Sequence, residues 1–157
     1  MKKVSIRTGE SVYNATEKAL DDLNFKIDDK NLQVMVKPNL TKNLPPESGV
    51  TTNSKSVKAI LERISQGNKI IIGEGSGGSK TDLALREQGY YKLSKQYDTE
   101  LSNFDKGEIV KRKIEDSFTT EEIPFAKEVL ESDFVISAAK LKTHSVTKAT
   151  LSMKNMF

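Results

Sequence analysis

The segment "KLKTHS", Lys140 to Ser145, combines the residue types of this sequence that are best suited to acid–base chemistry. His144 is the only histidine of the chain, and histidine is the side chain that ordinarily changes its charge near neutral pH. In an extended segment, Lys140, Lys142 and His144 would lie on one face. We therefore predict that His144 and Lys142 are the catalytic residues. Lys140 and Thr143 are predicted to bind a ligand, and a histidine without a catalytic role is the alternative.

The glycine-rich segment "GEGSGG", residues 73–78, follows the apolar run "KIII" and precedes a helix-like pattern. This order is a common arrangement for binding phosphate through backbone N–H groups. The glycine spacing matches a dinucleotide fingerprint, but neither Asp98 nor Asp105 stands where its acidic partner is expected. The lysine of a Walker A motif is also missing from its place. An anion-facing loop and a structural turn remain alternatives. The predicted ligand-binding residues here are Glu74, Gly75, Ser76, Gly77 and Gly78.

Two more polar segments, "KPN" at 37–39 and "TTN" at 51–53, flank predicted strand and helix ends. Lysine and asparagine side chains there supply hydrogen-bond donors and an acceptor, and a helix N-terminus favours anions. A solvated strand end and simple helix capping are the alternatives. No metal site is predicted, because a lone histidine needs further ligands. The predicted ligand-binding residues of these segments are Lys37, Asn39, Thr51, Thr52 and Asn53.

The composition is that of an ordinary globular protein, with 36% hydrophobic and 30% charged residues in a chain of 157. The sequence contains no cysteine, which excludes disulfides, thiol chemistry and a cysteine-ligated iron–sulfur cluster within this chain. No apolar run approaches the length of about 20 residues that spans a membrane, and the first residues lack an apolar signal core. We therefore expect a cytoplasmic protein without a membrane partner.

The net charge of +3 is unevenly distributed along the chain. Residues 140–157 contain four lysines and no Asp or Glu, whereas the first 139 residues hold 21 basic and 22 acidic side chains. The excess positive charge therefore belongs to the last segment, which is either a solvated basic tail or a surface that faces an anion. Nucleic acid is not an expected partner, because this segment has few aromatic side chains for stacking on bases.

Strands are predicted from the apolar runs at residues 2–7, 32–37, 68–73 and 133–138. Helical spacing predicts helices over residues 12–23, 53–66 and 79–88, and a short helix with Pro124 in its first turn. Residues 99–104 and 108–114 are predicted to form a hairpin around the turn Asp105–Gly107. The pattern favours one α/β domain over residues 1–157, a three-layer sandwich whose mainly parallel sheet has helices on both faces and a β-hairpin insertion.

The polar segments described above all follow predicted strands or begin helices. In parallel α/β sheets, ligands bind outside the carboxyl ends of the strands. We therefore expect the segments after residues 37, 73 and 138 to meet at one edge of the sheet. Lys37, Gly75 and Lys142 should then lie close together around a single site.

Five short motifs occur in a characteristic order. They are "VKPNLT" (36–41), "GVTTN" (49–53), "GEGSGG" (73–78), "GYYKL" (89–93) and "AKLKTHSVTKATLSMKN" (139–155). Together they resemble the domain-of-unknown-function 362 family over nearly the whole chain. The resemblance implies no established activity, and it implies that the chain is the N-terminal part of a longer domain. Lys154 and Asn155 of the last motif complete the predicted ligand-binding residues.

Many members of that family carry a ferredoxin-like module with cysteines for iron–sulfur clusters, which links the family to redox chemistry. These 157 residues lack that module, since they contain no cysteine. We predict a site for a small anion, a carboxylate or a phosphate, at the carboxyl edge of the sheet, with a link to redox chemistry and an unknown cofactor. The alternative is a non-catalytic module that docks on an iron–sulfur or other redox protein. A homodimer contact through the last, helix-like segment is also expected.

Overall fold

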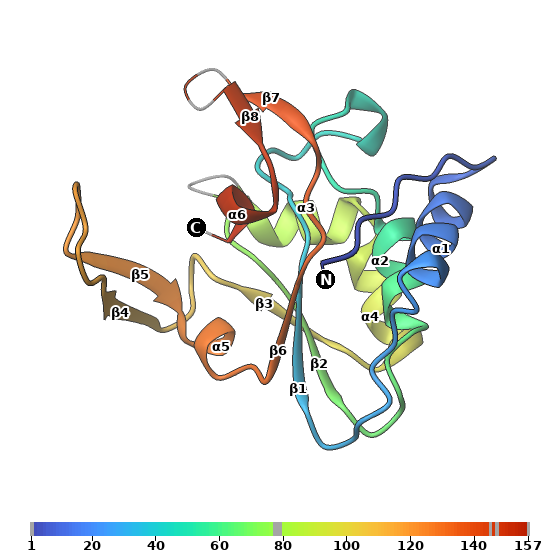
Figure 1. Ribbon diagram of the computed structural model, residues 1–157, viewed down its shortest axis with the longest axis horizontal. Helices are drawn as coiled ribbons and strands as arrows, with labels where there is room; N and C mark the ends of the chain where they lie inside the picture. Colours follow the sequence, from blue (N-terminus) through green and yellow to red (C-terminus); the bar gives the residue numbers. More distant parts are fainter. Residues whose placement is uncertain (1, 77–79, 145, 147, 157) are drawn as a thin grey trace.

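A four-stranded parallel sheet forms the centre of the computed structural model, which describes residues 2–76, 80–144, 146 and 148–156 (Figure 1). The strands follow the order β3-β2-β1-β6. Val34 of β1 pairs with Ile70 of β2 on one side and with Phe134 of β6 on the other. The prediction that these three strands are parallel neighbours is confirmed. The bounds are β1 (Gln33–Lys37), β2 (Lys69–Glu74), β3 (Glu100–Asn103) and β6 (Phe134–Ser137).

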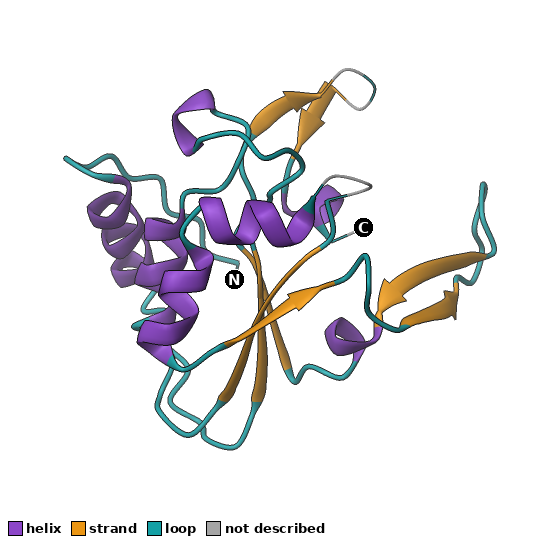
Figure 2. Cartoon of the chain, turned by 180° about the vertical axis from the view of Figure 1, so that it is seen from behind, coloured by secondary structure: helices purple, strands orange, loops and turns teal. Residues whose placement is uncertain are grey.

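Helices cover the two faces of this sheet unequally (Figures 1 and 2). The longer helices lie on one face, where α2, α3 and α4 share a core with the strands and α1 packs outside α2. The short helix α5 and residues of the neighbouring hairpin cover the other face. The fold is therefore α/β with a parallel core. The helices are α1 (Val12–Asp22), α2 (Ser54–Leu61), α3 (Thr81–Glu87), α4 (Tyr90–Tyr97), α5 (Lys127–Leu130) and α6 (Ser152–Asn155), with a 3-10 turn at Pro46–Ser48.

Side chains of the central strands alternate between the two cores. Val34 and Ile72 belong to the larger core beneath the long helices, whereas Met35 and Ile71 belong to the smaller one. Such strands are buried on both faces, which explains their continuous apolar sequence. Tyr90 of α4 is fully buried in the larger core, and its hydroxyl donates to the Thr52 carbonyl at 2.9 Å.

The predicted helix boundaries are partly confirmed. The Asn53 side chain caps α2 by accepting the Lys55 N–H at 2.9 Å. Gly89, at φ 83°, separates α3 from α4. Thr81 is the first residue of α3 and not its cap, and Ser79, the other predicted cap, lies outside the described residues.

One predicted strand and one predicted strand pairing are wrong. Residues 2–7 form no strand: the Ser5 and Arg7 side chains hydrogen-bond to Asp22 of α1 instead, and Val4 and Ile6 are 86% and 89% exposed. Residues 99–104 do not pair with 108–114; β3 instead joins the parallel sheet beside β2. The Asp105–Gly107 turn leads out of the sheet, and its Lys106 and Gly107 N–H groups both donate to the Asn103 carbonyl.

The hairpin insertion contains one of its predicted strands, within residues 108–114, but the other strand is not the predicted 99–104. Strand β4 (Ile109–Lys113) pairs antiparallel with β5 (Glu122–Ala126), so Pro124 lies in a strand and the short helix begins after it. A second hairpin, β7 (Lys142–His144) with β8 (Lys148–Thr150), stands above the carboxyl ends of the sheet strands (Figures 1 and 2). Within the described residues, no helix combines the length and apolarity needed to cross a membrane.

Gly73 in β2 has no room for a side chain. A Cβ there would lie 2.3 Å from the Phe104 ring and 3.0 Å from the Met35 sulfur. We predict that Gly73→Ala lowers the free energy of unfolding by about 1–3 kcal/mol through overpacking of the smaller core. Urea denaturation measures this change.

Gly107→Ala is the matched control, because a Cβ there meets its nearest neighbour at an ordinary 3.5 Å. It should change stability by no more than about 0.5 kcal/mol. Adding Phe104→Leu to Gly73→Ala should recover part of the loss. Equal stability of the two alanine variants would contradict the steric explanation.

Candidate functional site

Lys37 and Glu74 end the neighbouring strands β1 and β2 and form a buried ion pair. Their Nζ and Oε1 atoms lie 3.0 Å apart, and the side chains are only 8% and 3% exposed. The backbone N–H groups of Leu40 and Gly75 also donate to the Glu74 carboxylate, at 2.9 and 3.0 Å. Burial raises the pKa of the Glu74 carboxyl, and the Lys37 ammonium and these two N–H groups oppose that rise. Three donors thus hold the carboxylate at the carboxyl edge of the sheet.

Asn155 of α6 connects this ion pair to the far end of the chain. Its amide oxygen accepts from the Asn39 amide at 2.9 Å and from the Lys37 ammonium at 3.5 Å. Its amide nitrogen donates to the Lys37 carbonyl and to the Ser137 hydroxyl, both at 3.1 Å. The side chain is buried, and it fastens α6 to the ends of β1 and β6.

Lys142 extends from the β7–β8 hairpin, beyond the carboxyl ends of the sheet strands, to Asn39 and its neighbours. Its ammonium donates to the Asn39 amide oxygen at 2.5 Å, to the Val50 carbonyl at 2.7 Å and to the Thr41 hydroxyl at 3.3 Å. Burial lowers the pKa of Lys142; Glu74 opposes this shift, and nearby lysines add to it. Lys142 is therefore a cation held close to other cations.

These contacts enclose a small cavity of about 180 Å³ at the carboxyl edge of the sheet. Its lining comes from the segment after β1, the segment after β2, and α6. Its only described acidic lining residue, Glu74, is already paired with Lys37, so Lys154 and the adjacent Lys142 leave an excess of positive charge. The lining residues are Lys37, Asn39, Thr41, Glu74, Gly75, Ser76, Lys154 and Asn155.

The described part of the glycine-rich segment uses its N–H groups within the protein. Gly75 N–H donates to Glu74, and Ser76 N–H lies 3.1 Å from the Thr81 hydroxyl and 3.3 Å from the Asp105 carboxylate. A Cβ on Gly75 would lie 3.2 Å from Phe104. Gly75 therefore packs closely against Phe104, and the predicted residues Gly77 and Gly78 lie outside the described part of the chain.

Thr51, Thr52 and Asn53 support the site without lining the small cavity. The Thr51 hydroxyl donates to the Leu44 carbonyl at 2.9 Å. The Thr52 hydroxyl accepts the Asn39 N–H at 3.0 Å and donates to the Ala138 carbonyl at 2.7 Å. These threonines therefore fix the segments from which Lys37, Asn39 and Lys142 extend.

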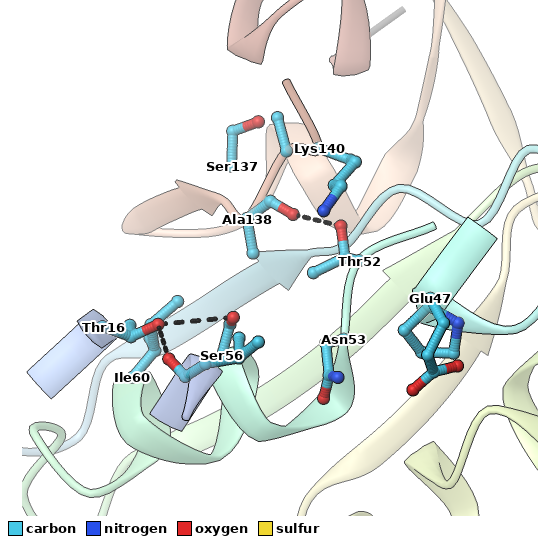
Figure 3. A pocket seen from close by; sticks show the side chains of 12 residues that line it. Thr16, Glu47, Thr52, Asn53, Ser56, Ile60, Ser137, Ala138 and Lys140 are labelled. Carbon is cyan, nitrogen blue, oxygen red and sulfur yellow. Dashed lines mark hydrogen bonds between the residues drawn. The ribbon is translucent and has the colours of Figure 1, made fainter. Parts of the chain in front are cut away.

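A second hollow, of about 450 Å³, lies on the other side of Thr52, between α1, α2 and the end of β6 (Figure 3). Lys140 lines this hollow together with Asn53 and Ser56, and not the small cavity. Lys140 thus lies apart from Lys142, whose ammonium bonds to Asn39 and Thr41 of the small cavity's lining; only residues 142–144 of this segment are in a strand.

His144 and Thr143 lie in the β7–β8 hairpin. The His144 Nδ1 accepts the Val146 N–H at 3.1 Å, and the Thr143 side chain is exposed. Neither residue lines the small cavity in the described part of the chain. Of the predicted site residues, the structure brings together Lys37, Asn39, Glu74, Gly75, Ser76, Lys142, Lys154 and Asn155.

Sequence reasoning missed two members of this site. Thr41 lines the cavity and also donates to Asn39, at 3.2 Å, and the Val50 carbonyl accepts from Lys142. Thr41 belongs to the "KPNLT" segment and could have been found as a polar residue four positions after the strand end. The role of the Val50 carbonyl depends on the path of the loop and leaves no signal in the sequence.

The described residues contain no cluster of three or more His, Cys, Asp or Glu side chains that could hold a metal ion. The chain also has no cysteine thiolate to offer an iron–sulfur cluster. The donors at the small cavity are ammonium, amide and hydroxyl groups, which suit an anion better than a cation.

The buried ion pair generates a prediction about stability. Lys37→Met and Glu74→Gln should each lower the free energy of unfolding by about 3–5 kcal/mol, because each leaves one buried group without its partner. The double variant should lose less than the sum of the two, by at least about 1 kcal/mol. Chemical denaturation of the four proteins measures this coupling.

The exposed pair Lys127–Glu108, at 2.9 Å with 40% and 66% exposure, is the control. Lys127→Met with Glu108→Gln should cost no more than about 1 kcal/mol. Strictly additive losses at Lys37 and Glu74 would show that the two side chains do not stabilise one another.

The chain is similar to known proteins over the region that contains the small cavity. The chain is 27% identical over 126 residues to the thylakoid-associated protein sll1697 of Synechocystis sp. (strain ATCC 27184 / PCC 6803 / Kazusa). The similar region covers 80% of this chain but 38% of that relative, so the chain spans well under half of the relative's length. No solved structure is significantly similar to the chain. Residues 34–157, which include the whole lining of the small cavity, match the family described as domain of unknown function (DUF362), and the chain therefore belongs to the DUF362 family.

Proposed function

We propose that this domain binds a small anion, a carboxylate or a phosphate, in the small cavity at the carboxyl edge of the sheet. The observation that carries the proposal is the charge of the lining. Lys37 neutralises the Glu74 carboxylate, while Lys142 and Lys154 add positive charge around a space of about 180 Å³. Charge-assisted hydrogen bonds from ammonium and amide groups are the contacts that carboxylates and phosphates accept best.

Lys142 is the residue that we propose for proton transfer within this site, if the bound anion is a substrate. Its lowered pKa brings the ammonium closer to the range in which a lysine gives up a proton. Its Nζ also touches Asn39 and Thr41, which line the cavity. His144 has less support for this role, because it is not among the described lining residues of the cavity and its Nδ1 accepts the Val146 N–H within its own hairpin.

Docking on another protein, such as a redox protein, is the second candidate function. Three apolar side chains of the last, basic segment are largely exposed: Leu141 by 74%, Val146 by 82% and Met153 by 79%. Such side chains are available for contact with a partner protein. The same surface would serve a homodimer, and sedimentation of the isolated chain separates these two outcomes.

The anion site predicts a specific effect of Lys154, which is exposed and lines the cavity. Lys154→Ala should weaken the binding of phosphate or acetate by about 1–3 kcal/mol, the cost of losing a hydrogen bond to a charged group. Isothermal titration calorimetry measures the affinities. Lys92→Ala, a change of an exposed lysine on α4, should leave them unaltered. Equal affinities of the two variants, or no anion binding by the unaltered chain, would retire the proposal.

Anion affinity should also depend on pH through Lys142. The protonated ammonium attracts the anion, so affinity is full below the pKa of Lys142 and falls as the pH rises through it. Because burial lowers that pKa from 10.5, the fall should begin at a lower pH than an ordinary lysine would produce. Titrations between about pH 7 and pH 10 test this, and Lys142→Gln should flatten the profile. If Lys142→Gln left the pH dependence of anion affinity unchanged, Lys142 would not contribute to anion binding.

A further inference from the structure

A third hollow, of about 380 Å³, adjoins the small cavity on the side of the β4–β5 hairpin. Lys37 and Gly75 line both spaces, so the two share a boundary at the buried ion pair. Most of the remaining lining is apolar. It consists of Phe104, Ile109, Pro124, Phe125, Ala126, Val129 and Met156, with Asp105 as a polar member.

The apolar hollow has a buried floor and an open rim. Phe104 and Ala126 are 8% and 7% exposed and belong to the smaller core, whereas Ile109 at the rim is 51% exposed. A volume of this size lies in the range of small-molecule pockets, which are largely apolar with a few polar groups that orient the ligand. The hollow can therefore take an apolar group the size of an aromatic ring.

Positive charge is concentrated at the small cavity and decreases towards the apolar hollow. The lysines surround the small cavity, whereas the apolar hollow has only Lys37 at the shared boundary and Asp105. The Asp105 carboxylate accepts from the Thr81 hydroxyl at 2.6 Å and lies 3.3 Å from the Ser76 nitrogen. Its negative charge disfavours a second anionic group in the apolar hollow, so a ligand with one charged end fits best.

We propose that the ligand of this domain is amphipathic: an anionic carboxylate or phosphate head that binds in the small cavity, joined to an apolar body that binds in the adjoining hollow. This inference rests on the proposed anion site and names the class of its ligand. The shared residues Lys37 and Gly75 mark the point where head and body join.

Inorganic phosphate and phenyl phosphate test the proposal, because they share a head and differ by an aromatic body. Calorimetry with the full chain should show phenyl phosphate binding at least about tenfold more tightly, as burial of a phenyl group implies. Ile109→Thr with Val129→Thr, which removes apolar atoms and adds hydroxyls to the hollow, should reduce this ratio several-fold. Ile109→Thr alone, at an exposed strand position, should reduce it in part and guards against a folding defect in the pair.

Val110→Thr is the matched control, since neighbouring residues of a strand face opposite sides and Val110 does not line the hollow. It should preserve the ratio, and Lys154→Ala should weaken both ligands by the same factor. Phosphate binding with no gain from the phenyl group, a ratio insensitive to Ile109→Thr with Val129→Thr, or equally tight binding of neutral benzyl alcohol would overturn the inference and leave the anion site standing. Failure of both phosphates to bind would overturn the anion site itself, and the inference with it.

Discussion

The buried pair of Lys37 and Glu74 is the interaction on which the carboxyl edge of this fold depends. Removing two charges from water costs several kcal/mol for each ion, and only close pairing with additional hydrogen bonds offsets that cost. Here the strand register brings the two residues to adjacent strand ends, and the N–H groups of Leu40 and Gly75 supply the remaining donors. The paths of the segments after β1 and β2 are therefore constrained by the need to solvate one carboxylate.

The buried charge of Glu74 also affects Tyr90 in the larger core. Burial raises the pKa of Tyr90 well above its usual value, and the charge of Glu74 adds to that effect, so the phenol stays protonated and donates to the Thr52 carbonyl. Thr52 in turn accepts from Asn39 and donates to Ala138. A chain of hydrogen bonds thus links the helix-covered core to the loops that carry the lysines. Fully satisfied polar networks of this kind rigidify the groups that they connect.

Much of this arrangement is readable from the sequence. The continuous apolar runs at β1 and β2 predict buried strands, and β6 is their predicted parallel neighbour, although it lies exposed at the sheet edge. The rule that sites lie at carboxyl ends predicts that Lys37, Gly75 and Lys142 approach one another. Other features depend on tertiary context. The alternating residues 99–104 could pair locally or extend the sheet, and burial of Phe104 against β2 favours the sheet. The expectation of a shared face holds for Lys142 and His144, which stand two positions apart in β7, but not for Lys140, because the strand begins only at Lys142.

The contact between Asn155 and the end of β1 joins residues 118 positions apart in the sequence. β1 already pairs with β6 across 100 positions, so once the sheet has formed only the short segment after β6 remains to be closed when α6 docks. The small cavity gains its lining residues Lys154 and Asn155 only when α6 has docked. Since α6 is a single turn with Met153 exposed, its release would cost far less than unfolding the sheet. Amide hydrogen exchange in this domain should therefore be fast at α6 and slow in β1, with the site opening as a unit of its own.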